Sequence, residues 1–143
     1  MNSKLKICFV CTGNACRSQM AEGLAKKIAN SKVDVYSAGS HPAGFIPDKT
    51  VQIMKEIGID ITSHSSKGLG DVPLQEMNYV ITLCDDATSF CPTVLAKGQK
   101  LHWPFPDPTR VLGKEERVLG AYRQIRDALA KKLEQWIPTV ITS

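Results

Sequence analysis

Apolar residues alternate along the chain between short runs and helical repeats. LKICFV, at residues 5–10, is a short apolar run that predicts a buried strand. The segment SQMAEGLAKKIAN, after the next turn, places Met20, Leu24, Ala25 and Ile28 at the spacing of one helix face. Comparable patterns predict further strands over 33–39, 78–84 and 99–103 and further helices over 48–58 and 114–137, with Asp48 as the N-cap and Gly58 as the stop of the 48–58 helix.

This alternation of strands and helices indicates an α/β fold built on a parallel sheet with right-handed crossovers. The chain has 143 residues, of which 43% are hydrophobic, so we expect a single domain, residues 1–143, around one core. The proline-rich stretch WPFPDPTRVLG is expected to form an extended surface loop.

Charge and cysteine content narrow the class of protein. The chain has 18 Lys and Arg residues and 14 Asp and Glu residues, which gives a net charge of +4. The basic residues form no run, so the sequence argues against a nucleic-acid-binding surface and favours the binding of small anions. No apolar segment approaches the roughly 20 residues of a membrane span, and the first apolar run is too short for a signal peptide. We therefore expect a cytoplasmic protein, a monomer by default, whose five cysteines are reduced thiols rather than a disulfide framework.

The loop CTGNACR, residues 11–17, lies where an α/β sheet collects its ligands, beyond the carboxyl end of the first strand. Gly13 and Asn14 tolerate a positive φ, which allows successive backbone N–H groups to point into one concavity. The following helix adds N–H donors and a partial positive charge of roughly half an elementary unit. Ser18 stands where a capping hydroxyl is expected, so the pattern predicts a cradle for an anion.

Cys11 and Arg17 supply the reactive groups that such a cradle needs. The planar Arg17 fork can hold two oxygens of a tetrahedral oxyanion. Cys11 lies in the same positive field, which favours its thiolate, the form that attacks phosphorus or arsenic. A small core hydrophobe is the alternative role for a cysteine behind a strand.

The stretch VCTGNACRSQMAEG resembles the signature loop of the low-molecular-weight tyrosine phosphatase superfamily, in particular of its thioredoxin-coupled arsenate reductases. The resemblance extends over essentially the whole chain and implies a three-layer sandwich in which helices flank a four-stranded parallel sheet. The residues that it assigns to the oxyanion are Thr12, Gly13, Asn14, Ala15, Cys16, Arg17 and Ser18.

The resemblance also implies a general acid, Asp107 in FPDPT, which would protonate a departing oxygen. An ordinary Asp-Pro turn is the alternative. Thr109 stands where tyrosine phosphatases of the superfamily often carry a tyrosine that lines the pocket of an aromatic substrate. A flat aryl substrate would lose that platform here.

The motif LCDDATSFC places Cys84 at the end of the predicted third strand and Cys91 seven residues later. Cysteines at this spacing relay electrons in the reductases that the chain resembles, which implies disulfides Cys11–Cys84 and then Cys84–Cys91. If the first and third strands are neighbours, their ends lie about 4.8 Å apart, within the ~7 Å between Cα atoms that a disulfide allows. Two buried small hydrophobes are the alternative, and the spacing is poor for zinc.

Cys91 requires a conformational change to reach Cys84. Seven residues of helix rise ~10 Å, which is beyond disulfide reach. We therefore predict that residues 84–98 are mobile and differ between the reduced and oxidised forms.

The resemblance further implies that Asn14, Ser37 and Ser65 support the loop, where some relatives bind potassium together with Glu22. Lys67 stands where those relatives carry an acidic residue, and its ammonium can replace the metal charge; an exposed loop lysine is the alternative. We expect no bound metal or cofactor, and no role is predicted for the three histidines.

Three functions remain open at this point. The preferred one is reduction of arsenate to arsenite, with thioredoxin, or a glutaredoxin system, as electron donor. A phosphatase would use the same Cys11, Arg17 and Asp107 but leaves the pair Cys84 and Cys91 unexplained. The third function is that of a non-catalytic sensor of oxyanions or of redox state, in which Cys11 and Cys84 become oxidised without catalytic turnover.

Overall fold

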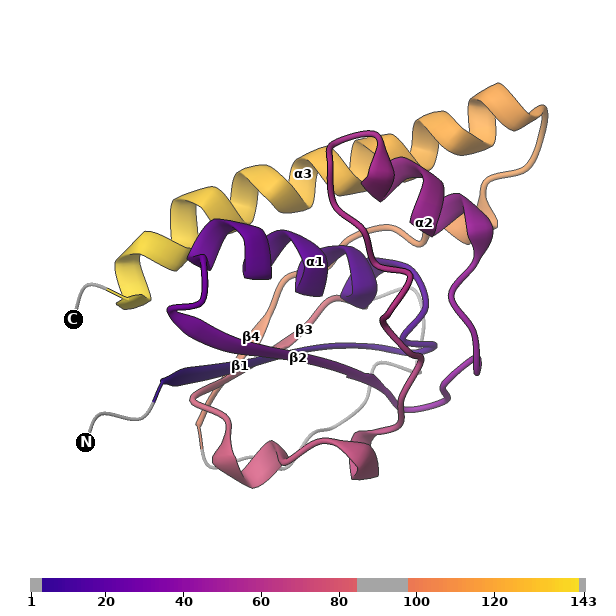
Figure 1. Ribbon diagram of the computed structural model, residues 1–143. Helices are drawn as coiled ribbons and strands as arrows, with labels where there is room; N and C mark the ends of the chain where they lie inside the picture. The colour runs from indigo at the N-terminus through magenta and orange to yellow at the C-terminus, as the bar shows by residue number, and fades with distance from the viewer. Residues whose placement is uncertain (1–3, 85–97, 142–143) are drawn as a thin grey trace.

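The computed structural model describes residues 4–84 and 98–141. Four parallel strands form one sheet in the order β2-β1-β3-β4, so that the first strand is central and pairs with the second and the third (Figure 1). The strands are β1 (Leu5–Cys11), β2 (Val33–Gly39), β3 (Tyr79–Thr82) and β4 (Gln99–His102). The predicted parallel α/β sheet is therefore confirmed, and the first and third strands are neighbours, which is the condition for their ends to lie within disulfide distance.

Three α-helices cover one face of this sheet, and two 3₁₀ turns lie on the opposite face (Figure 1). The helices are α1 (Arg17–Ala29), α2 (Asp48–Lys55) and α3 (Glu115–Ile141). The 3₁₀ turns of the opposite face are η1 (Leu69–Asp71) and η2 (Leu74–Glu76), while a third, η3 (Pro108–Arg110), follows β4. Because both faces are covered, the central strands read as nearly continuous apolar runs.

The side chains of β1 alternate between two apolar cores. Ile7 and Phe9 are fully buried on the helix side, in one cluster with Met20 of α1 and Leu129 of α3. Cys8 is fully buried in the smaller cluster on the other face.

Three predicted helix limits are wrong by a few residues. Asp48 is the first residue of α2 and not its cap, because Pro47 occupies the N-cap position and makes no side-chain cap. The helix ends at Lys55, and Gly58, with φ +80°, closes the turn that follows. At the other end of the chain, α3 continues past the predicted limit at 137 and through Pro138 for one more turn.

The predicted third strand also ends early, since β3 stops at Thr82. Leu83 N still donates to Val10 O at 2.8 Å, so the chain follows β1 until Cys84. Cys91 and most of the segment predicted to be mobile, 84–98, lie outside the described residues. Within the described part of the chain, no helix is long and apolar enough to cross a membrane.

The end of β2 lies directly against the loop that follows β1. Gly39 pairs with Cys11 in the sheet register. A Cβ at Gly39 would lie 2.5 Å from Thr12 O and 2.8 Å from Asn14 N, closer than non-bonded atoms allow. A glycine is therefore required by backbone approach and not by a positive φ.

Gly39→Ala is expected to lower the free energy of unfolding by about 1–3 kcal/mol, because the added methyl group displaces backbone atoms of the 11–14 loop. Denaturant titration measures the change. Gly70→Ala is the matched control, since a Cβ there meets no atom within 4 Å, and its effect should stay within about 0.5 kcal/mol. Equal effects of the two substitutions would contradict the steric explanation.

Arg126 of α3 connects the end of α2 to the rest of the helical layer. The buried guanidinium donates from Nη1 to Ile53 O at 2.7 Å and to Glu56 Oε1 at 2.8 Å. Arg123 adds a bidentate contact to Glu56, with Nη2 2.8 Å from Oε2. Hydrogen bonds from Arg123 and then Arg126 lower the pKa of Glu56 from 4.5 to about 2.

Glu56→Gln is expected to lower the melting temperature at pH 7, and the loss should shrink as the solution is acidified. The pKa of Glu56 is lowered in the folded state, so its stabilisation is fully present above pH 4.5 and is lost as the pH falls toward about 2. Melting curves of wild type and variant between pH 7 and pH 2.5 test this. Glu134→Gln, on an exposed position of α3, should show no comparable dependence on pH. A difference that is constant with pH would contradict the ionic origin.

Candidate functional site

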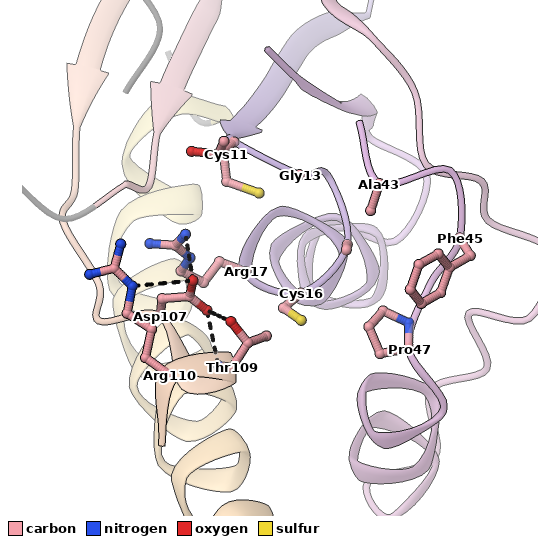
Figure 2. Close-up of a pocket in the computed structure, with 12 residues that line it drawn as sticks. Cys11, Gly13, Cys16, Arg17, Ala43, Phe45, Pro47, Asp107, Thr109 and Arg110 are labelled. Carbon is pink, nitrogen blue, oxygen red and sulfur yellow. Dashed lines mark hydrogen bonds and ion pairs between the residues drawn. The ribbon is translucent and has the colours of Figure 1, made fainter. Parts of the chain in front are cut away.

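A cavity of about 340 Å³ opens beyond the carboxyl end of β1 (Figure 2). The loop after β1 forms its floor, residues 43–47 form one wall, and residues 107–110 form the wall opposite (Figure 2). The residues that line it are Cys11, Thr12, Gly13, Ala15, Cys16, Arg17, Ala43, Phe45, Pro47, Asp107, Thr109 and Arg110. The structure thus gathers Cys11, Arg17 and Asp107, which are distant in sequence, around one cavity.

Arg17, the first residue of α1, is almost fully buried. Its Nη1 donates to Phe105 O at 3.0 Å and to Leu83 O at 3.5 Å, and its Nη2 lies 3.9 Å from Asp107 Oδ2. These contacts hold the guanidinium in one orientation, as recognition of a planar pair of oxygens requires.

Cys11 is a free thiol, 2% exposed, at the last position of β1. Its Sγ lies 2.9 Å from Ser18 Oγ, and that oxygen accepts a hydrogen bond from Asn14 Nδ2 at 2.8 Å. Because Ser18 Oγ already accepts from Asn14, its own proton is available to the sulfur. A hydrogen bond donated in this way stabilises negative charge on Cys11.

This contact replaces the predicted capping role of Ser18, which is wrong. Cys16 is the N-cap residue of α1, and no side chain caps the helix. Ser18 lies inside the first turn and is fully buried, so its hydroxyl faces the sulfur.

Within the loop of residues 11–17, which the structure describes in full, Asn14 adopts a positive φ of +47°. Gly13 does not adopt a positive φ, although the sequence suggested that both residues would. The loop carbonyls are held from outside: His41 N donates to Thr12 O at 2.8 Å, and Ala43 N donates to Gly13 O at 2.9 Å. The turn at Asn14 and these anchors fix the curvature of the loop.

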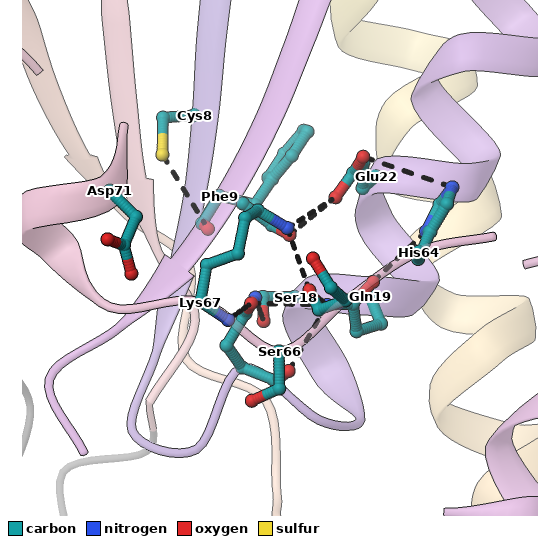
Figure 3. Close-up of polar contacts among 12 residues, drawn as sticks. Cys8, Phe9, Ser18, Gln19, Glu22, His64, Ser66, Lys67 and Asp71 are labelled. Atoms are coloured by element: carbon teal, nitrogen blue, oxygen red, sulfur yellow. Dashed lines mark hydrogen bonds and ion pairs between the residues drawn. The ribbon is translucent and has the colours of Figure 1, made fainter. Parts of the chain in front are cut away.

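A buried polar network supports the loop from behind (Figure 3). Gln19 Nε2 donates to Asn14 O at 3.1 Å and to Ser65 O at 2.9 Å, while Gln19 Oε1 lies 3.0 Å from His64 Nδ1. Burial lowers the pKa of His64, so the ring is neutral at pH 7 and donates its Nδ1 proton to Gln19. Gln19 and His64 were not predicted as functional residues, because their contacts join segments far apart in the sequence.

Glu22 is the buried carboxylate of this network (Figure 3). Burial would raise its pKa, but hydrogen bonds from Lys26 and Ser37 outweigh burial and lower it. Lys67 Nζ donates to Ser65 O at 2.8 Å and lies 4.0 Å from Glu22 Oε1. An ammonium therefore lies beside the carboxylate, as expected if Lys67 supplies a positive charge here. Among the described residues, no group of three or more His, Cys, Asp or Glu side chains is suited to hold a metal ion.

Cys84 is fully buried beside the loop, with its Sγ 3.9 Å from Thr12 Oγ1. Thr12 is the residue after Cys11, so the chain that follows β3 places a second sulfur beside the loop at this point.

Cys16 and Cys8 are buried thiols whose pKa values are raised. Burial raises the pKa of Cys16 to about 11, although Thr50 Oγ1 donates to its sulfur at 3.3 Å. Burial also raises the pKa of Cys8 to about 12. Both groups are therefore protonated thiols at neutral pH and poor nucleophiles.

Asp107 is the N-cap of η3 and presents one oxygen to the cavity. Its Oδ1 accepts from Thr109 N at 2.9 Å and from Thr109 Oγ1 at 2.6 Å. Its Oδ2 lies 3.9 Å from Arg17 Nη2 and 4.0 Å from Arg110 Nε. The Asp-Pro turn thus occupies one oxygen of Asp107 and leaves the other toward Arg17.

Comparison with known proteins agrees with this geometry. Residues 6–143 match the family described as low molecular weight phosphotyrosine protein phosphatase. The arsenate reductase of Halalkalibacterium halodurans is 42% identical over 139 residues, which cover 97% of this chain and 99% of that protein.

Solved structures agree as well. An arsenate reductase in the phosphate binding state has a TM-score of 0.80 at 29% identity, covering 95% of this chain and 98% of that one. The thioredoxin-dependent arsenate reductase of Corynebacterium glutamicum has a TM-score of 0.65 at 30% identity, covering 94% of this chain and 65% of that one. The match to the family over nearly the whole length confirms the resemblance seen in the 10–23 stretch, and the chain belongs to the low molecular weight phosphotyrosine protein phosphatase family.

Proposed function

We propose that this protein reduces arsenate to arsenite through Cys11, with Cys84 and Cys91 as a disulfide relay and thioredoxin as the electron donor. The observation that carries the proposal is the position of Cys84, buried with its sulfur 3.9 Å from Thr12 Oγ1, next to the nucleophile. Hydrolysis of a phosphate ester needs no such second sulfur. The relatives named arsenate reductase support the same function.

Arsenate binds in the cavity to the N–H groups of residues 12–18 and to Arg17. The carbonyls of Thr12 and Gly13 are occupied by donors outside the loop, which favours N–H groups that face the ligand. The N-terminus of α1 and the Arg17 guanidinium supply positive charge.

Cys11 attacks arsenic and forms an S–As bond, while one arsenate oxygen leaves. Ser18 stabilises the attacking thiolate through its 2.9 Å contact. Asp107 donates a proton from Oδ2 to the departing oxygen, which leaves as water. The products of this step are a Cys11–arsenic adduct that still holds As(V) and an Asp107 carboxylate.

Cys84 next attacks the sulfur of Cys11. The S–As bond breaks and its electron pair stays on arsenic, so that As(V) becomes As(III) and leaves as arsenite after taking up a proton. The two sulfurs are oxidised together to the Cys11–Cys84 disulfide. Cys91, outside the described residues, then attacks Cys84 and transfers the disulfide to Cys84–Cys91, from which thioredoxin takes the oxidising equivalents.

Two further points support thioredoxin as the electron donor and the cytoplasm as the compartment. One structural relative is named as thioredoxin-dependent. The relay needs reduced thiols at rest, which the cytoplasm maintains. We also propose that the protein acts as a monomer, since only Phe45 and Leu112 are exposed large hydrophobic side chains among the described residues.

A second activity, hydrolysis of phosphate monoesters, is favoured by the same cavity. Cys11, Arg17 and Asp107 surround it as nucleophile, anion ligand and acid, and phosphate shares the charge and tetrahedral shape of arsenate. We propose that this activity is residual, because nothing in it requires Cys84.

The relay is tested by arsenate-dependent NADPH oxidation with thioredoxin and thioredoxin reductase. Cys11→Ser, Cys84→Ser and Cys91→Ser are each expected to reduce turnover by at least about 100-fold, because each removes a thiol of the exchange sequence. Cys91→Ser should still release one arsenite per molecule and accumulate the Cys11–Cys84 disulfide, detected by mass spectrometry of peptides. Hydrolysis of an aryl phosphate should survive in Cys84→Ser and Cys91→Ser and be lost in Cys11→Ser.

Cys8→Ala is the matched control, since Cys8 is a buried thiol of the opposite core, and it should retain turnover within about twofold. Equal arsenate turnover in wild type, Cys84→Ser and Cys91→Ser would refute the relay. Oxidation of wild-type cysteines without repeated release of arsenite would instead identify a sensor.

Asp107→Asn is expected to lower kcat for arsenate by about 10²- to 10⁴-fold, because the amide oxygen keeps the Thr109 contacts but the amide has no acidic proton to transfer. KM should change by less than about threefold, since Arg17 and the loop still bind the anion. Steady-state kinetics measure both values. Asp34→Asn on β2, at the other end of the sheet, should leave them unchanged. A kcat for Asp107→Asn within about threefold of wild type would exclude the general acid role.

A further inference from the structure

Phe45 is exposed in a position where a large apolar side chain is unusual. It is 63% exposed, and Leu112, at 79%, is its only counterpart among the described residues. Phe45 lines the catalytic cavity, whereas Leu112 does not. In Figure 2 its ring stands beside Pro47 on the wall opposite Asp107 and Thr109.

This wall is held firmly to the reactive loop. Ala43 N donates to Gly13 O at 2.9 Å, and Ser66 Oγ donates to the same oxygen at 2.9 Å while accepting from Gly44 N at 3.2 Å. Gly44, at φ +87°, turns the chain so that Phe45 follows directly. The backbone that leads into Phe45 is therefore anchored to the loop that follows Cys11.

The cavity is larger than an inorganic oxyanion needs. Arsenate has five heavy atoms, and at roughly 30 Å³ for each water-sized group it occupies roughly 150 Å³. The cavity measures about 340 Å³, so more than half of it remains beyond the anion. Ala43, Phe45 and Pro47 offer apolar surface to whatever fills that space.

We propose that Ala43, Phe45 and Pro47 form a subsite for an aryl group attached to the oxyanion, and that monoaryl arsonates are a substrate class of this protein. Aromatic rings gain from contact with a preformed aromatic wall. Thr109 stands where tyrosine phosphatases of the superfamily often carry a tyrosine; here the aromatic surface lies on the opposite wall. The substrate part of this proposal rests on the proposed arsenate reduction.

Reduction of an arylarsonate follows the same steps as the proposed reduction of arsenate. Cys11 forms an S–As bond to the arsonate and one oxygen leaves as water, with its proton from Asp107. Cys84 attacks Cys11, and the S–As electron pair stays on arsenic. The products are the Cys11–Cys84 disulfide and an arylarsonous acid, in which the carbon–arsenic bond is intact and arsenic is reduced from As(V) to As(III).

The subsite is tested first by binding, without turnover. Isothermal titration calorimetry of the reduced protein compares phenylphosphonate with methylphosphonate, which present the same anion and cannot be reduced. Wild type is expected to bind the phenyl compound roughly 3- to 10-fold more tightly. Phe45→Ala should reduce that preference to less than about twofold and leave binding of inorganic phosphate unchanged, while Leu112→Ala should keep the preference.

The substrate class is tested by phenylarsonate-dependent NADPH oxidation with the thioredoxin system, with phenylarsonous acid identified by chromatography. Phe45→Ala should lower kcat/KM for phenylarsonate roughly 3- to 10-fold relative to that for arsenate. Equal affinities for the two phosphonates in wild type, or equal loss of phosphate binding in Phe45→Ala, would overturn the subsite. Turnover of arsenate without any turnover of phenylarsonate would overturn the substrate class. A phenyl preference that depends on Phe45, in a protein that does not reduce arsenate, would leave the subsite standing and refute the proposed function.

Discussion

The buried amide of Asn14 is the group on which the rest of the site depends. It allows the left-handed turn of the loop at φ +47°. Its Nδ2 directs Ser18 toward Cys11, and its Oδ1 accepts from Lys67 N at 2.7 Å. One side chain thus joins the backbone turn, the hydroxyl that contacts Cys11 and the 65–67 segment. Because the amide is fully buried, loss of any one of these bonds leaves a polar group without water to replace it.

The sequence was sufficient for the architecture because the period of the apolar positions is a local property. Runs such as residues 5–10 and repeats such as Met20, Leu24 and Ile28 depend only on which face is buried. The limits of the elements were less predictable. Asp48 has the chemistry of a cap, but Pro47 takes that position, and α3 continues through Pro138 where the preceding turns are already formed and packed.

The site was predictable where it is contiguous and unpredictable where it is not. Cys11, Arg17 and the loop between them lie in one stretch whose chemistry can be inferred directly from the residues. Ser18 was assigned to the helix because a local capping bond is the usual use of such a serine, yet tertiary contact with Cys11 prevails. The contacts of Gln19 with Ser65 and His64 span more than forty residues and carry no local signal. The position of Phe45 in the cavity could likewise not be predicted, because it depends on the folded 43–47 segment lying beside the loop.

The buried guanidinium of Arg17 connects two segments of the chain. Its Nη1 reaches both Leu83 O, where the chain leaves the sheet toward Cys84, and Phe105 O, where the chain returns before Asp107. Leu83 directly precedes Cys84, the sulfur proposed to attack Cys11, and Phe105 lies two residues before Asp107, the proposed acid. Both segments are therefore hydrogen-bonded, through these carbonyls, to one guanidinium. An anion held by Arg17 would therefore contact the same guanidinium that joins the chain before Cys84 to the chain before Asp107.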